Sequence, residues 1–269
     1  MLKRISILAI LIVWTFPISA AEGVVHLATS TSTANSGLLT VLRPAFEKSS
    51  GLALKVTAVG TGRALRMGRQ GAVDAVLVHA PEAESHFVFT GYGIDRRPVM
   101  FNYFVIVGPE GDPAGVRKAR DIQEAMARIA DSGAGFVSRG DDSGTHKREF
   151  RLWDEATIEP YGNAWYLELG VGMANALKSA SDRGFYTLSD KGTWLAHAPN
   201  LKLTLLFEGG RLLYNPYHVI AVNPQRHASV NHAGARILMH WLVSEEAQGL
   251  IDAYRIDGIQ LFRPRRDMN

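Results

Sequence analysis

Short apolar segments alternate with amphipathic ones along this chain, and their order constrains the fold more than any other feature. Three apolar segments, 24–28, 54–59 and 74–79, have the length of buried strands. Helical segments separate them, one over 36–50 and a shorter one that begins at Arg63. A β-α-β-α-β order is typical of a doubly wound parallel sheet, whose ligands bind at the carboxyl ends of the strands. The sequence therefore predicts an α/β fold with a ligand crevice.

The first predicted helix, over 36–50, places Leu42 and Phe46 on one face, and Gly51 follows it as a stop signal. Pro44 lies inside this segment, where it lacks the N–H that an interior helical residue donates. We therefore expect the helix to be kinked at this proline.

Two later apolar segments, 101–108 and 217–222, are flanked by prolines and look like crossings between two lobes. If both cross, residues 22–107 and 216–269 form one discontinuous lobe, and residues 108–215 form the other. Both lobes then have the usual size of a domain. The pattern also predicts strands over 135–138, 185–188 and 202–207, and helices over 143–156, 172–181 and 232–244.

The N-terminal segment, residues 1–21, has the layout of a secretory signal peptide. Lys3 and Arg4 precede an apolar run over 5–16, and small residues follow at 19–21. This run is shorter than the roughly 20 residues that a membrane-spanning helix needs. We therefore expect the segment to be cleaved and the mature protein to reside in the periplasm.

Composition and charge exclude several classes of function. The chain has 29 basic and 26 acidic residues, and the predicted signal holds two of the bases, so the mature protein is nearly neutral. Without a basic block, nothing indicates a nucleic-acid partner. The chain has no cysteine, which rules out thiolate metal sites and thiol nucleophiles. Its nine histidines show no metal-site spacing, and Glu82 and Glu84 are expected on an exposed, solvated turn.

The segment 28–36 carries the strongest polar signal. Six of its nine residues bear a hydroxyl group, and it joins a predicted strand to a predicted helix. Capping the helix needs one hydroxyl, so the surplus fits a loop that directs O–H and N–H groups at an anion beside the positive helix end. A solvated loop rich in serine and threonine explains the same composition.

A second strand-to-helix turn spans 138–147. Arg139 offers a planar fork of donors that suits an oxyanion. The helix start adds donors at Ser143, Gly144 and Thr145. In a purely structural interpretation, Asp142 or Ser143 caps the helix, and Arg139 pairs with Asp141 or Asp142.

The third turn, 59–63, reads Val-Gly-Thr-Gly-Arg. It lacks the Lys-Ser/Thr ending of a nucleotide-binding loop and a glycine of the dinucleotide pattern. As a tight turn it presents backbone N–H groups and the Thr61 hydroxyl. Because both predicted lobes contribute such turns, we expect them to share one crevice.

Ser143 and His146 are the pair that a hydrolase could use. They lie three residues apart on one predicted helix, where a nucleophile and its base seldom align with an oxyanion hole. The chain has no Gly-x-Ser-x-Gly elbow. We expect His146 on the helix surface and no enzymatic activity, and a secreted serine hydrolase is the less favoured alternative.

Eight segments carry a family resemblance: ATSTSTANSGLL (28–39), FEKSSGLALKVTAVGTGRAL (46–65), VDAVLVHAPEAE (73–84), GYGIDRRPVMFNYFVIVGP (91–109), SRGDDSGTHKRE (138–149), WYLELGVGM (165–173), YTLSDKGTWLA (186–196) and NPYHVIAVNP (215–224). They resemble the periplasmic tungstate-binding proteins of ABC importers. The resemblance implies a type II periplasmic binding protein, in which two doubly wound α/β lobes are joined by two crossing strands with a ligand cleft between them. It also implies a monomer that delivers its ligand to an ABC permease in the inner membrane.

The same resemblance implies the ligand and its site. The ligand is tungstate, with molybdate as the second candidate, bound as an oxyanion without a cofactor and without direct protein–metal ligands. The family's oxyanion contacts fall on Ser30, Thr31, Thr61, Arg139, Ser143, Gly144 and Thr145. This chain departs from the family at Val171, where a polar residue is common, and an apolar wall there would change selectivity.

Phosphate stays open as an alternative ligand on residue chemistry alone. Tungstate and molybdate are fully deprotonated at neutral pH, so a pocket of donors satisfies them. Phosphate is largely monoprotonated, and its O–H group needs an acceptor. Asp141 or Asp142 could be that acceptor. Rejection of the smaller sulfate depends on pocket size.

Overall fold

The structure is a computed structural model that describes residues 23–267. The signal peptide predicted over 1–21 lies outside the described residues. Within them, no helix is both long and apolar enough to cross a membrane.

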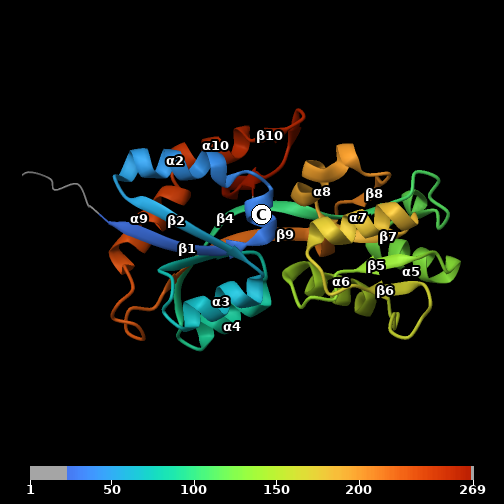
Figure 1. Cartoon of the computed structure of the whole chain (residues 1–269), viewed down its shortest axis with the longest axis horizontal. Coiled ribbons are helices and arrows are strands. Elements are labelled where there is room, and N and C mark those ends of the chain that lie inside the picture. Colours follow the sequence, from blue (N-terminus) through green and yellow to red (C-terminus); the bar gives the residue numbers. More distant parts are fainter. Residues whose placement is uncertain (1–22, 268–269) are drawn as a thin grey trace, which may run out of the picture.

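The first lobe is built on the predicted parallel strands. β1 (Val24–Ser30) pairs in parallel with β2 (Ala53–Val59) and with β3 (Ala75–Val78). Helices cover both faces of this sheet, with α2 and α10 above it and α3 and α4 below it in Figure 1. The bounds of these helices and of α9 are Leu39–Ser50 (α2), Thr61–Arg69 (α3), Pro81–Phe89 (α4), His232–Leu242 (α9) and Glu245–Ala253 (α10).

Alternating residues of the strands fill two separate cores. Val25 and Leu27 of β1 pack with α2, α9 and α10, whereas Ala28 and Val76 pack with α3 and α4. Both faces of the sheet are thus buried, which is why its strands read as continuous apolar runs in the sequence.

Two long strands join this lobe to the second one. β4 (Gly93–Gly108) and β9 (Tyr214–Val222) pair with each other in antiparallel register. β9 also pairs with β3, and β4 also pairs with β7 (Tyr186–Asp190) of the second lobe. Along β4, Met100 still packs in the core of the first lobe, whereas Phe104 packs in the second.

The second lobe repeats the α/β pattern. β5 (Phe136–Ser138) lies parallel to both β6 (Tyr166–Glu168) and β7. One core packs under α5 and α6, and another packs under α7 and α8. The remaining bounds are Ile122–Ser132 (α5), Gly144–Glu155 (α6), Met173–Arg183 (α7), Lys191–His197 (α8), Thr204–Glu208 (β8), Arg255–Ile256 (β10), Ile259–Gln260 (β11) and Arg263–Pro264 (β12).

The helix predicted over 36–50 begins three residues later than expected, at Leu39. A short helix, α1 (Thr31–Asn35), precedes α2, and Gly37 lies between them with φ +78°. A Cβ atom at Gly37 would lie 2.5 Å from Tyr254 Oη, which donates to the Ser36 carbonyl oxygen. α2 then continues through Pro44 as one helix.

The expected solvated turn at Glu82 and Glu84 is wrong for Glu84. This segment begins α4, and Glu84 is fully buried. Its carboxylate accepts from the Ala80 N–H at 2.6 Å and from Arg96 at 2.7 Å. Glu84 is buried because β4 supplies a cation that the local sequence does not reveal. Glu82 is exposed, as expected.

Candidate functional site

All seven predicted site residues line one small cavity between the lobes. The centre of a water-sized sphere can move through only about 10 Å³ of it. An oxygen atom has about the radius of such a sphere, so this space admits the oxygens of one small anion and excludes a sugar or nucleotide. The lining residues are Ser30, Thr31, Ser32, Gly60, Thr61, His79, Arg139, Ser143, Gly144 and Thr145.

The turn between β1 and α1 contributes a chain of hydroxyl groups. Ser30 caps α1 by accepting from the Thr33 N–H at 3.2 Å. Its Oγ also lies 2.9 Å from Ser32 Oγ and 2.7 Å from Thr33 Oγ1. All three side chains are buried, so part of the hydroxyl surplus seen in the sequence serves this internal network.

The other two turns meet across the cavity. Thr61 opens α3 and is buried, and a Cβ atom at Gly144 would lie 3.6 Å from its Oγ1. Ser143 caps α6 by accepting from the His146 N–H at 3.2 Å. Gly144 and Thr145 therefore occupy the first turn of a 12-residue helix, where backbone N–H groups have no intrahelical acceptor. The predicted N-cap at Ser143 is present.

Arg139 is the cation of the cavity and is 5% exposed. Its Nη2 donates to Asp141 Oδ2 at 2.5 Å, and its Nη1 lies 3.4 Å from Thr145 Oγ1. Its Nε is buried and finds no hydrogen-bond partner among the described residues. A buried N–H without an acceptor is costly, so the guanidinium is suited to an anionic ligand as well as to Asp141.

His79 lines the same cavity, and sequence reasoning did not identify it. Its Nε2 lies 3.0 Å from Ser32 Oγ, and its Nδ1 lies 2.9 Å from Asn215 Oδ1. Burial lowers the pKa of this imidazole. A signal was available, because His79 directly follows β3 at the carboxyl edge of the parallel strands, where ligands bind.

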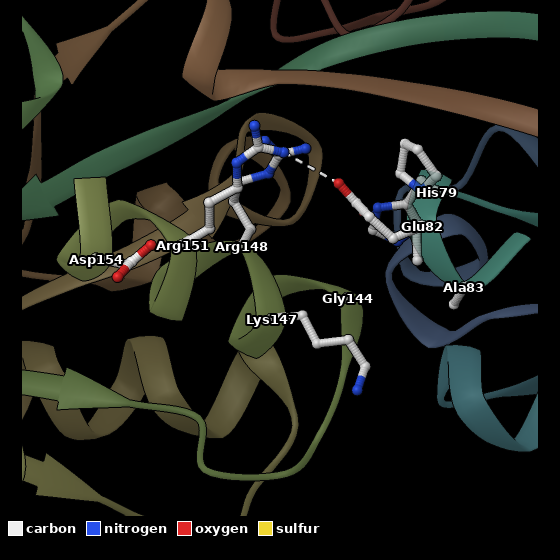
Figure 2. Close-up of a pocket in the computed structure, with 10 residues that line it drawn as sticks. His79, Glu82, Ala83, Gly144, Lys147, Arg148, Arg151 and Asp154 are labelled. Atoms are coloured by element: carbon white, nitrogen blue, oxygen red, sulfur yellow. Dashed lines mark hydrogen bonds and ion pairs between the residues drawn. The ribbon is translucent and has the colours of Figure 1, made fainter. Parts of the chain in front are cut away.

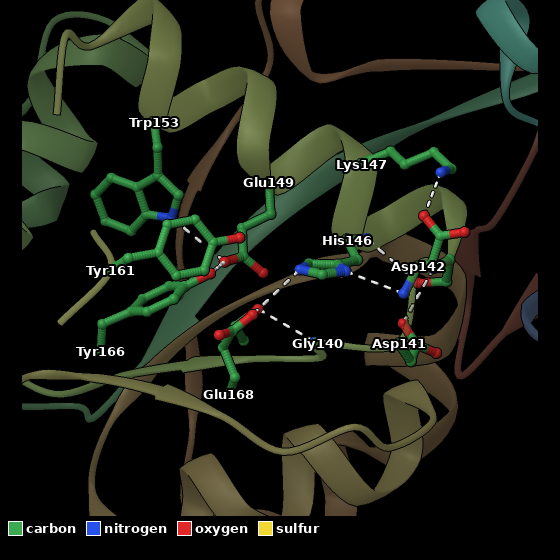
Figure 3. A network of polar contacts seen from close by, with 12 residues as sticks. Gly140, Asp141, Asp142, His146, Lys147, Glu149, Trp153, Tyr161, Tyr166 and Glu168 are labelled. Carbon is green, nitrogen blue, oxygen red and sulfur yellow. Dashed lines mark hydrogen bonds and ion pairs between the residues drawn. The ribbon is translucent and has the colours of Figure 1, made fainter. Parts of the chain in front are cut away.

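His146 lies beneath the Arg139 turn and not on the helix surface, so that expectation is wrong. It is 8% exposed, and its Nδ1 accepts from the Asp142 N–H at 3.0 Å (Figure 3). Glu168 Oε1 lies 3.6 Å from its Nε2. The ring thus supports the turn, and no hydrogen bond joins it to the Ser143 hydroxyl in the described part of the chain.

Glu149 is the second buried titratable group under this turn (Figure 3). Its Oε1 accepts from Tyr166 Oη at 2.7 Å and from Trp153 Nε1 at 3.3 Å. Burial raises the pKa of this carboxyl group to about 7. The network ties α6 to β6 and so fixes the helix whose first turn lines the cavity.

A larger cavity, shown in Figure 2, shares His79 and Gly144 with the small one. The centre of a water-sized sphere can move through about 430 Å³ of this larger cavity. Lys147, Arg148 and Arg151 of α6 line it. Arg151 Nη1 lies 3.0 Å from Glu82 Oε1 of α4, so an ion pair links the two lobes here. Arg148 donates to the Leu212 carbonyl oxygen at 3.0 Å.

The donor set of the small cavity fits an anion better than a metal cation. No carboxylate of the described residues lines it. Within residues 23–267, no group of three or more His, Asp or Glu side chains is placed to hold a metal ion. Val171 does not line the cavity either and packs partly buried against the core under α7.

Two α/β lobes joined by β4 and β9, with a small cavity between them, define the architecture of a type II periplasmic binding protein. Residues 18–246 match the family model of the PBP superfamily domain. The tungstate-binding protein TupA of Peptoclostridium acidaminophilum is 44% identical over 248 residues, which are 91% of this chain and 86% of that protein. The chain belongs to this family of TupA tungstate-binding proteins.

Solved structures agree with this assignment. The structure titled as the tungstate ABC transporter from Geobacter sulfurreducens is 45% identical with a TM-score of 0.80, over 86% of this chain and 98% of that one. The tungstate-binding protein TupA from Desulfovibrio alaskensis G20 is 43% identical with a TM-score of 0.81, over 90% and 98%. At these identities, the likeness extends to the family as well as to the fold.

Proposed function

We propose that this protein captures tungstate, with molybdate as the second candidate ligand, and delivers it to an ABC permease. One observation carries the proposal: a small cavity lined by hydroxyls, first-turn N–H groups and one buried arginine, with no carboxylate among the lining residues that the structure describes. The family membership supports tungstate as the particular anion. The seven lining residues predicted from the sequence would make the oxyanion contacts.

The two carboxylates that could favour phosphate have other partners. Asp141 accepts from Arg139 and from the Ser143 N–H, and Asp142 is exposed and pairs with Lys147. Neither side chain lines the cavity. Among the described lining residues, a protonated phosphate oxygen would therefore find hydroxyl oxygens but no carboxylate as acceptor, which disfavours it against a fully deprotonated dianion.

The proposal also covers export, oligomeric state and lobe closure. Cleavage of residues 1–21 would release a monomer into the periplasm. Lobes at 22–107 plus 216–269 and at 108–215 would close on the ligand about the two crossing strands. Capture and release require no catalysis, and the ring of His146 bonds to a backbone N–H instead of activating Ser143.

Calorimetric titration of the mature protein with tungstate, molybdate, sulfate and phosphate tests the proposal. We expect tight one-to-one binding of tungstate and much weaker binding of sulfate and phosphate. Tight phosphate binding without a response to tungstate would refute it. Thr40→Ala, at an exposed position of α2, serves as a control that should bind like the wild type.

A further inference from the structure

His79 connects the cavity to the strands that join the lobes. It is 4% exposed, and its ring stacks on Tyr217 of β9 with centroids 4.5 Å apart. One ring nitrogen contacts Ser32 in the cavity wall, and the other contacts Asn215 of β9. Both nitrogens of a buried imidazole are therefore engaged, so its hydrogen positions are set by these two partners.

Asn215 determines which ring nitrogen carries a hydrogen. Its Nδ2 donates to Asn102 Oδ1 at 2.6 Å and to Tyr217 Oη at 3.2 Å. Both amide hydrogens are used there, so Asn215 Oδ1 accepts from the Nδ1–H of His79. In a neutral imidazole the other nitrogen, Nε2, is then an acceptor. The Ser32 hydroxyl must donate to it.

This hydrogen bond removes a donor from the cavity. Ser32 has one hydroxyl hydrogen, and when that hydrogen points at His79, only lone pairs face a bound anion. A second ring hydrogen, on Nε2, reverses the bond. Nε2–H then donates to Ser32 Oγ, and the hydroxyl hydrogen is free to donate to the anion. The protonation state of His79 thus changes the number of donors that the cavity offers.

Charged and titratable groups face the ring from several elements. Asp190 at the end of β7 and Glu84 of α4 favour a charged imidazole, whereas Arg139 disfavours it. Glu84 is already paired with Arg96 and His218, and Arg139 is paired with Asp141. The cations farther out, in the adjoining cavity, are Lys147, Arg148 and Arg151.

Of the charged groups near His79, Asp190 has the largest effect on the pKa of the ring, and it raises that pKa. It is 1% exposed, and its Oδ2 has no hydrogen-bond partner in the described part of the chain. In the empty cavity, burial lowers the pKa of His79, although Asp190 and Asn215 oppose this effect. A dianion would add two negative charges beside the ring, and nearby negative charge stabilises an imidazolium.

We propose that the cavity takes up one proton on His79 when it binds its oxyanion, so that anion and proton bind together. This inference rests on the proposed function of the cavity. The proton comes from solvent, and no covalent bond to the anion forms. His79 is a positioning residue, since it acts on the anion through Ser32. As pH rises between the pKa of the free and the bound imidazole, the Kd should rise by up to about tenfold per pH unit.

Calorimetry in buffers of different ionisation enthalpy tests this with the wild-type protein. The slope of the observed enthalpy of tungstate binding against buffer ionisation enthalpy gives the number of protons taken up. We expect net uptake of up to one proton, and a Kd that rises with pH above the lowered pKa of the free imidazole. In ¹⁵N spectra of labelled histidine, Nε2 of His79 should change from an acceptor to an N–H on binding.

His79→Gln is the decisive variant, because its amide can donate to Ser32 without titrating. It should still bind tungstate, with no proton uptake and a Kd independent of pH over this range. His26→Gln, a histidine of β1 outside the cavity wall, is the matched control and should keep both effects. If His79→Gln fails to fold, the ¹⁵N measurement on the wild type decides.

Four results would overturn the inference. Tight tungstate binding without proton uptake would do so and would leave the proposed function intact. That result would mean that both amides are turned over and that a neutral Nε2–H tautomer of His79 supplies the donor. Uptake that persists in His79→Gln, or that disappears in His146→Gln, would place the proton elsewhere. Absence of tungstate binding would overturn the proposed function and this inference with it.

Discussion

Replacing Arg139 by alanine should cost more affinity than removing any one hydroxyl group of the cavity. The guanidinium is 5% exposed, and among residues 23–267 no other arginine and no lysine lines the cavity. Hydrogen bonds to charged groups contribute about 1.5–3 kcal/mol each, and leaving a buried charge without its partner costs about 3–5 kcal/mol. Arg139→Ala removes the partner of both the anion and Asp141. We expect a loss of about 3–5 kcal/mol, a rise in Kd of roughly 10² to 10⁴-fold.

Titration calorimetry with tungstate, run beside thermal unfolding of the empty protein, measures this effect. Thr145→Ala provides the hydroxyl comparison and should lose about 1–2 kcal/mol. Arg151→Ala is the matched arginine control, since its ion pair with Glu82 joins the lobes but is exposed, and such pairs contribute about 1 kcal/mol or less. If folded Arg139→Ala binds tungstate within a few-fold of the wild type, Arg139 serves only to hold Asp141 and the reasoning is wrong.

Three further predictions concern stability. Burial raises the pKa of Glu149 from 4.5 to about 7, so the folded state binds more protons than the unfolded state in this window. Its contribution is greatest below pH 4.5 and falls as pH rises, by about 3 kcal/mol up to pH 7; Glu149→Gln should flatten the pH dependence of the free energy of unfolding measured in urea. Glu84→Ala should lower that free energy by about 1.5–3 kcal/mol because it leaves the buried Ala80 N–H and the partly exposed Arg96 without their acceptor, whereas exposed Glu82→Ala should change it by less than about 1 kcal/mol. Gly37→Ala should lower the thermal midpoint, at a cost above about 1 kcal/mol, because φ is +78° and the new Cβ would clash with Tyr254; an unchanged midpoint would contradict this.

The cavity could be anticipated because its parts are local in the sequence. Each of the three turns joins a strand to a helix within a few residues, and the surplus of hydroxyls around Ser30 and the Arg139 to Thr145 segment are visible without a structure. The parallel order of the first three strands also follows from local pattern, since β-α-β units place consecutive strands in one sheet.

The remaining features depend on partners that lie far away in the chain. His79 bonds to Asn215, 136 residues later, and its role in the cavity cannot be inferred from either residue alone. Glu84 is buried because Arg96 of β4 pairs with it, and the break at Gly37 is fixed by Tyr254. Local sequence thus determined where donors gather, because helix starts and hydroxyl spacing are properties of adjacent residues. Only the tertiary structure decided which groups are buried with them, because the cost of burying a polar group depends on the partners that the fold brings to it.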